Sequence, residues 1–188
     1  LKIDIIRISE EITRTQESLA VAEKNVEAAK NGMSLQNAPL PECRVVLTDA
    51  QSRCFEDIRK GFAAGKPVLL HGTTGSGKTE LYIKAAYDVL NKGRNVLYLV
   101  PEIALTPQLL GLLAAYFGEK VAVLHSSLSA GERYDQWKRV KSGEAKVVVG
   151  TRSAVFAPAA NLALIILDEE QEHSYKSENS PRYDAREV

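Results

Sequence analysis

The stretch Gly72-Thr73-Thr74-Gly75-Ser76-Gly77-Lys78-Thr79 decides how the rest of this sequence is interpreted. It fits the phosphate-binding pattern of a glycine, four residues and then Gly-Lys-Thr. In such a loop, successive backbone N–H groups point at an anion, and glycines let phosphate oxygens approach the backbone. We expect Lys78 to reach the β and γ phosphates, and the Thr79 hydroxyl to ligate Mg²⁺. Residues 72–79 are therefore the predicted ATP-binding loop.

The flanks of the loop have the composition that this motif requires. Residues 66–71 are apolar enough to form a strand, and residues 78–90 have the pattern of a helix. A glycine-rich turn without a ligand would not need a strand before it and a helix after it. The flanks therefore favour a true phosphate loop.

Short apolar runs alternate with helical segments from residue 43 onward, which is typical of a parallel sheet covered by helices on both faces. We expect helices to begin near Asp49, Lys78, Pro107 and Gly131, with Thr106 as an N-cap. The predicted class is an α/β domain with a doubly wound, mainly parallel sheet of the RecA-like phosphate-loop type. The expected strands are 68–71, 95–100, 121–125, 146–150 and 162–167.

Polar residues follow each expected strand, as in sheets whose ligands bind beyond the carboxyl ends of the strands. Asp168 and Glu169 come directly after the apolar run 162–167. We expect Asp168 to hold Mg²⁺ together with Thr79, usually through water. Glu169 can orient and deprotonate the attacking water. Lys78, Asp168 and Glu169 are thus the predicted catalytic residues.

Gln51 has two interpretations. With Thr48 it makes the capping box of a helix, which needs no ligand. A glutamine about twenty residues before a phosphate loop can also read adenine through its paired amide donor and acceptor. The two roles can coexist.

Composition excludes several other classes of protein. The 188 residues carry 24 basic and 24 acidic side chains, so binding to a polyanion has to come from local sites. Cys43 and Cys54 lack neighbours at metal-ligand spacing, and no run of 18 apolar residues occurs. We expect a cytoplasmic protein without a membrane partner. The start at Leu1 indicates a segment of a larger protein.

Residues 1–30 lack glycine and place apolar or small side chains at helical spacing, which predicts one long N-terminal helix. Small residues along this stripe favour packing against another part of the parent protein over dimerisation. Pro39 and Pro41 mark a linker. The predicted organisation is a helix and linker over 1–42 and an ATP-binding domain over 43–188.

These motifs together resemble the superfamily 2 DNA helicases, and among them the bacterial primosomal helicases. The resemblance runs from about Leu47 to the end of the sequence. It is carried by residues 70–80, 99–108, 125–129, 132–133, 137, 143–145, 149–158, 167–170 and 181–183.

The resemblance implies an ATP-driven motor that moves 3′ to 5′ on single-stranded or forked DNA and acts with other replication-restart proteins. It also implies zinc, but only in parts of such proteins outside this sequence. Hydroxyls, amides and aromatic rings are suited to hold DNA without reading its sequence. For Thr106 the capping role is an equal alternative. The implied DNA-binding residues are Thr106, Gln108, Thr151, Arg152, Tyr175, Lys176 and Arg182.

Two positions depart from the family pattern. Gln171 stands where the family usually has the histidine of Asp-Glu-Glu-His, and Asp184 replaces the histidine of Pro-Arg-Tyr-His. Glutamine cannot become positively charged, so it cannot take over a role that requires a protonated histidine. An acid at 184 weakens a direct phosphate contact there.

The arginine that completes hydrolysis in such motors comes from a second domain. We therefore expect these residues to bind nucleotide with little turnover. Two alternatives stay open, namely another superfamily 2 translocase and an ATP-gated binding module that does not hydrolyse.

Overall fold

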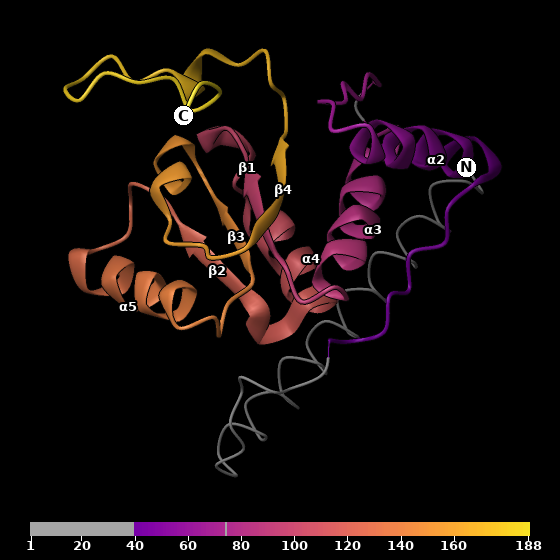
Figure 1. Cartoon of the computed structure of the whole chain (residues 1–188). Helices are drawn as coiled ribbons and strands as arrows, with labels where there is room; N and C mark the ends of the chain where they lie inside the picture. Colours follow the sequence, from indigo (N-terminus) through magenta and orange to yellow (C-terminus); the bar gives the residue numbers. More distant parts are fainter. Residues whose placement is uncertain (1–39, 74) are drawn as a thin grey trace, which may run out of the picture.

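Figure 1 shows the computed structural model, which describes residues 40–73 and 75–188. The predicted helix over residues 1–30 lies outside these ranges, and so does Thr74 of the phosphate loop. The predicted boundary near residue 43 therefore stays a prediction.

The described residues form a parallel sheet of four strands in the order β2-β3-β1-β4. In the register, Val96 lies beside Val147 and Leu99 lies beside Leu167. β1 is buried along its whole length, as expected of a central strand covered on both faces. The predicted parallel α/β class is confirmed. The strands are β1 (Asn95–Leu99), β2 (Val121–Leu124), β3 (Val147–Gly150) and β4 (Leu162–Leu167).

Helices cover both faces of this sheet. α3 (Lys78–Leu90) and α4 (Pro107–Phe117) pack on the face that carries Val96, Tyr98 and Ile166, and α2 (Asp49–Ala63) joins the same core through Phe55. α5 (Ala130–Lys141) packs on the opposite face through Val140. Figure 1 shows α5 and α3 on opposite sides of the sheet. This arrangement makes the fold doubly wound, as predicted.

α2 and α4 begin at the capping residues that the sequence predicts. Thr48 and Gln51 form a capping box at α2, and Ser129 and Glu132 form one at α5. At α4, the Thr106 hydroxyl accepts a hydrogen bond from the Leu109 amide at 3.2 Å.

Short 3-10 helices follow several elements, namely η2 (Glu102–Ala104), η3 (Gly118–Lys120), η4 (Arg152–Phe156) and η5 (His173–Tyr175).

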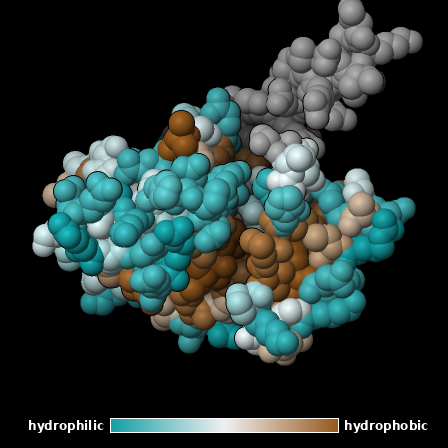
Figure 2. Space-filling model, turned by 90° about the horizontal axis from the view of Figure 1, so that it is seen from above, coloured by the Kyte–Doolittle hydropathy of each residue, from teal (hydrophilic) through white to brown (hydrophobic). Residues whose placement is uncertain are grey.

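The predicted strand over 68–71 is wrong. These residues have no regular secondary structure and pair with no strand, and Leu69 is 82% exposed. β4 is therefore an edge strand within the described part of the chain. β propensity alone does not form a strand, because the backbone also needs a neighbour in register to satisfy its hydrogen bonds. Here a cavity of about 770 Å³ separates 67–72 from β4. The view from above shows apolar surface in a hollow between polar parts of the molecule (Figure 2).

After β4 the chain crosses above the carboxyl ends of the strands, as the yellow segment of Figure 1 shows. An isolated antiparallel bridge between Lys176 and Asp184 closes this segment on itself. In the part of the chain that is described, no helix combines the length and apolar character needed to cross a bilayer.

Candidate nucleotide and DNA sites

The phosphate loop leads directly into α3. Gly75 and Gly77 have φ angles of 77° and 83°, in the left-handed region that glycine adopts without steric cost. Gly77 is the N-cap of α3 and has no side chain to cap the helix. The first amides of α3 are therefore available to an anion, which the helix dipole also favours at this end.

The side chain of Lys78 turns back over the loop. Its Nζ donates to the carbonyl oxygens of Gly72, at 2.7 Å, and Thr73, at 3.2 Å. A Cβ added at Gly72 would come within 2.6 Å of the Ser76 Oγ, so a larger residue here would have to displace the Ser76 side chain. The loop thus brings an ammonium group, free amides and close backbone approach to one place, which fits a bound phosphate.

Gln51 lies against the same loop. Its Oε1 accepts from the Thr48 amide at 2.9 Å, which confirms the capping interpretation. Its Nε2 donates to the Gly77 carbonyl at 3.4 Å, and a Cβ on Gly77 would come within 2.2 Å of that nitrogen. The side-chain amide of Gln51 therefore caps α2 and at the same time lies beside the phosphate loop. Reading of adenine by Gln51 remains a prediction.

Asp168 lies just beyond the end of β4 and is held by several donors. The Tyr98 hydroxyl donates to Oδ2 at 3.1 Å and the Tyr82 hydroxyl approaches Oδ1 at 3.5 Å. The Glu169 amide also donates to Oδ1, at 3.1 Å. Burial, followed by the negative charge of Asp168, raises the pKa of the Tyr98 and Tyr82 hydroxyls well above the usual tyrosine value. Both tyrosines therefore stay protonated as donors.

Glu169 has an unusual backbone. Its φ of 48° lies in the left-handed region, which residues other than glycine rarely adopt. Where they do adopt it, they occur preferentially at functional sites. Gln171 donates from Nε2 to the Glu169 carboxylate at 2.6 Å. The residue that replaces the family histidine thus binds the predicted catalytic glutamate directly.

The loop and the acidic pair lie at one edge of the sheet. Gly72, Lys78, Glu169 and Gln171 all line the cavity between residues 67–72 and β4. Tyr82, one helical turn after Lys78, reaches Asp168. The arrangement provides cationic, amide and carboxylate groups around one space, as binding of a metal–nucleotide complex requires.

Some of the predicted DNA-contacting residues are exposed, and others face the interior of the domain. Gln108 is exposed at the start of α4, beside the capping residue Thr106. Thr151 is only 3% exposed, so its side chain faces the interior. Arg152 donates from Nη1 to the carbonyl oxygens of Ser174 and Lys176, at 3.2 Å each. Arg152 therefore joins η4 to the segment after β4.

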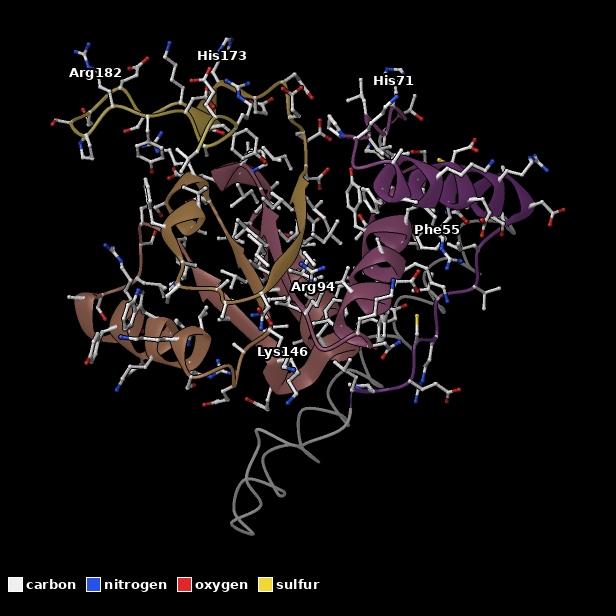
Figure 3. The ribbon with its side chains drawn as sticks, in the orientation of Figure 1. Phe55, His71, Arg94, Lys146, His173 and Arg182 are labelled. Carbon is white, nitrogen blue, oxygen red and sulfur yellow. The ribbon has the colours of Figure 1, made fainter. Side chains whose placement is uncertain are left out.

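The prediction that Tyr175 stacks on DNA bases is wrong for this structure, because its ring is fully buried. Its hydroxyl donates to the carbonyl oxygens of Asp168, at 2.5 Å, and Leu99, at 3.1 Å. The apolar surroundings at the strand ends bury the ring, and the backbone carbonyls satisfy its polar end. Lys176 and Arg182 are exposed, and Figure 3 shows Arg182 pointing away from the body.

Asp184, the second departure from the family pattern, is paired within the protein. Arg186 donates to both of its carboxylate oxygens, at 2.8 and 2.6 Å, and also to the Glu170 carbonyl. These hydrogen bonds lower the pKa of Asp184 to about 2. This pairing ties the end of the chain to the turn that follows β4.

Sequence reasoning missed Tyr82 and Tyr98. A signal was present, because Tyr98 stands between two leucines of a buried strand and its hydroxyl needs a partner there. Tyr82 lies four residues after Lys78 and so shares a helix face with it. The partner itself could not be read from the sequence, since it comes from a different strand.

The chain matches the DEAD/DEAH box helicase family over residues 48–186. Curated relatives include the replication restart protein PriA of Bacillus subtilis, which is 51% identical over 158 residues. PriA of Synechocystis is 47% identical over 173 residues. These alignments cover 83% and 90% of this chain and 19% and 20% of the relatives. The chain thus spans about a fifth of the length of these relatives.

A solved structure of RecG bound to a three-way DNA junction has a similar fold. Its TM-score is 0.59 at 26% sequence identity, and the match covers 86% of this chain and 21% of RecG.

Proposed function

The chain belongs to the DEAD/DEAH box helicase family, and on that premise we propose that it is the ATP-binding half of an ATP-dependent 3′ to 5′ DNA helicase of replication restart. Identity to the PriA relatives, at 51% and 47%, favours this task over that of other DNA translocases. The single observation that carries the proposal is the shared cavity of the phosphate loop and Glu169.

The proposed roles belong to residues that line that cavity or lie next to its lining in the chain or in space. Lys78 holds the β and γ phosphates once its ammonium leaves the Gly72 and Thr73 carbonyls. Residues 72–79, including Thr74, supply the amides of the phosphate cradle. Gln51 lies beside that loop and reads adenine. Asp168 and the Thr79 hydroxyl hold Mg²⁺, which neutralises phosphate charge when bound.

Glu169 acts as the base that orients water. Glu169 lies in the turn after β4. Its left-handed backbone and the hydrogen bond from Gln171 fix the direction of its carboxylate. Because Gln171 cannot carry a positive charge, it orients Glu169 without changing the net charge of the site. The arginine that completes the reaction in such motors belongs to a second domain, so these 188 residues bind nucleotide with little turnover.

DNA is the proposed partner at the carboxyl edge of the sheet, in single-stranded or forked form, with other replication-restart proteins as further partners. Gln108, Lys176 and Arg182 are the exposed candidates among the residues proposed from sequence. Thr106, Thr151 and Arg152 support that edge through capping, burial and hydrogen bonds to the segment after β4. Because the proposed function is to act on replicating DNA, the proposed location is the cytoplasm.

Nucleotide binding tests the proposal directly. We expect the 188-residue chain to bind a fluorescent ATP analogue with Mg²⁺, and Lys78→Ala to weaken binding by at least about a hundredfold because charged hydrogen bonds to phosphate are lost. Lys92→Ala, beyond the far end of α3, is the matched control and should bind normally. No binding by the unaltered chain would refute the proposal.

In the whole protein, Glu169→Gln separates the motor from a binding module. We expect the variant to keep nucleotide affinity and to lose unwinding of a forked DNA substrate. Unwinding at the normal rate would contradict the role of Glu169.

A further inference from the structure

We propose that Tyr98 and Tyr82 are positioning residues that hold the Asp168 carboxylate for Mg²⁺–nucleotide binding, with Tyr98 the stronger of the two. The inference rests on the proposed nucleotide site and adds residues to it from β1 and α3. Neither tyrosine belongs to the phosphate loop or to the acidic turn.

The hydroxyl groups account for most of the donors that reach this carboxylate. Tyr98 donates to Oδ2 at 3.1 Å, whereas Tyr82 lies 3.5 Å from Oδ1. Oδ1 receives a second donor, the Glu169 amide, and Oδ2 has Tyr98 alone among the described donors. A carboxylate oxygen offers two lone pairs. Oδ2 therefore keeps one site for a metal or a metal-bound water.

Core packing alone does not explain these hydroxyls. Tyr98 is only 2% exposed, and its neighbours on β1 are aliphatic, so phenylalanine would serve for packing. Burying a hydroxyl is costly unless it finds a partner. Here two rings, packed edge to face with centroids 5.7 Å apart, direct both hydroxyls at one carboxylate.

The positions of the two tyrosines connect the acid to the phosphate loop. Tyr82 follows Lys78 by one helical turn on α3, so the helix that presents Lys78 and Thr79 also contacts Asp168. From the other side, the Tyr175 hydroxyl holds the Asp168 carbonyl. Side chain and backbone of Asp168 are thus fixed independently. Loss of one hydroxyl leaves the fold in place and frees the carboxylate to rotate.

The test compares nucleotide affinity with Mg²⁺ and with EDTA in the 188-residue chain. For Tyr98→Phe we expect affinity with Mg²⁺ to fall about tenfold, as for loss of a group that orients a metal ligand. Affinity in EDTA should not change. Tyr82→Phe should show the same pattern with a smaller loss, because its contact is longer.

Tyr87→Phe is the matched control. Tyr87 lies on α3, the helix that carries Tyr82, and is 3% exposed. It donates to the carbonyl oxygens of Pro41 and Tyr116 rather than to Asp168. We expect its loss to lower the melting temperature without changing the ratio of the two affinities. If Tyr98→Phe behaves like Tyr87→Phe, the positioning role is refuted.

A double-variant cycle identifies the group through which Tyr98 acts. In an Asp168→Asn background, Tyr98→Phe should cause no further loss of affinity with Mg²⁺, since the partner carboxylate is already gone. An undiminished further loss would overturn the inference while leaving the proposed function intact. If the unaltered chain binds no nucleotide, both proposals fail.

Discussion

Two apolar runs lead to the two halves of the candidate site, and they behave in opposite ways. Residues 162–167 form β4, which pairs with β1 and buries Leu164 and Ile166. Residues 67–71 lead to the phosphate loop but pair with no strand, and Leu69 is 82% exposed. Both runs have strand-like composition. Only the first has a neighbour in register to receive its backbone hydrogen bonds.

The difference separates a fixed part of the site from a less constrained one. Asp168 is held by its backbone and its side chain, and the rest of the segment after β4 is anchored by Tyr175, Arg152 and Arg186. The loop before α3 is held within the described chain chiefly by Lys78 and Gln51. We infer that the acidic half is pre-organised and that the phosphate half adjusts to its ligand.

The largest effect that we expect comes from the anchor of the fixed half. Tyr175→Ala should lower the free energy of unfolding by about 3 to 5 kcal/mol, because it leaves a cavity where a fully buried ring packs. Urea denaturation measures the change. Tyr175→Phe keeps the ring and should lose about 1 kcal/mol for the hydrogen bonds. If Tyr175→Ala lowered the free energy of unfolding by less than about 1 kcal/mol, this ring would not anchor the segment after β4.

A pair of truncations tests the comparison itself. Ile166→Ala in β4 removes a side chain that is 7% exposed and should cost about 2 to 5 kcal/mol. Leu69→Ala removes an exposed side chain and should change stability by less than about 0.5 kcal/mol. Equal losses in urea denaturation would show that both runs are buried in solution, which would contradict the contrast.

The smallest effect concerns the ion pair at the end of the segment after β4. Arg186 lowers the pKa of Asp184 to about 2, so its stabilising contribution exists above the ordinary value of 3.8 and disappears as pH falls through about 2. In Arg186→Gln the pKa should rise toward 3.8, as followed by NMR titration of the carboxyl carbon.

Arg182→Gln is the control for that titration. Arg182 points outward in Figure 3 and is not among the groups that lower the pKa of Asp184, so this pKa should stay near 2. An unchanged value in Arg186→Gln as well would show that the pair does not form in solution.

Local rules were sufficient for much of this protein. The start of α4 at Thr106 and Pro107, the capping box of Thr48 and Gln51 and the parallel class of the sheet follow from residue types and periodicity. Four of the expected strands are present, because each buries β-branched or aliphatic residues against helices. The expectation that the phosphate loop acts together with Asp168 and Glu169 also came from the sequence, because polar residues follow each expected strand.

Residue types and local spacing are sufficient to predict the phosphate loop, the acidic end of a strand and the alternation of strands and helices. These features depend on neighbours a few residues away, so local physics specifies them. Long-range packing settles three other features, namely the unpaired residues 68–71, the burial of Tyr175 and the contact of Tyr98 and Tyr82 with Asp168. Each of these depends on a partner many residues distant, since burial and hydrogen bonding are settled by what the folded chain brings alongside.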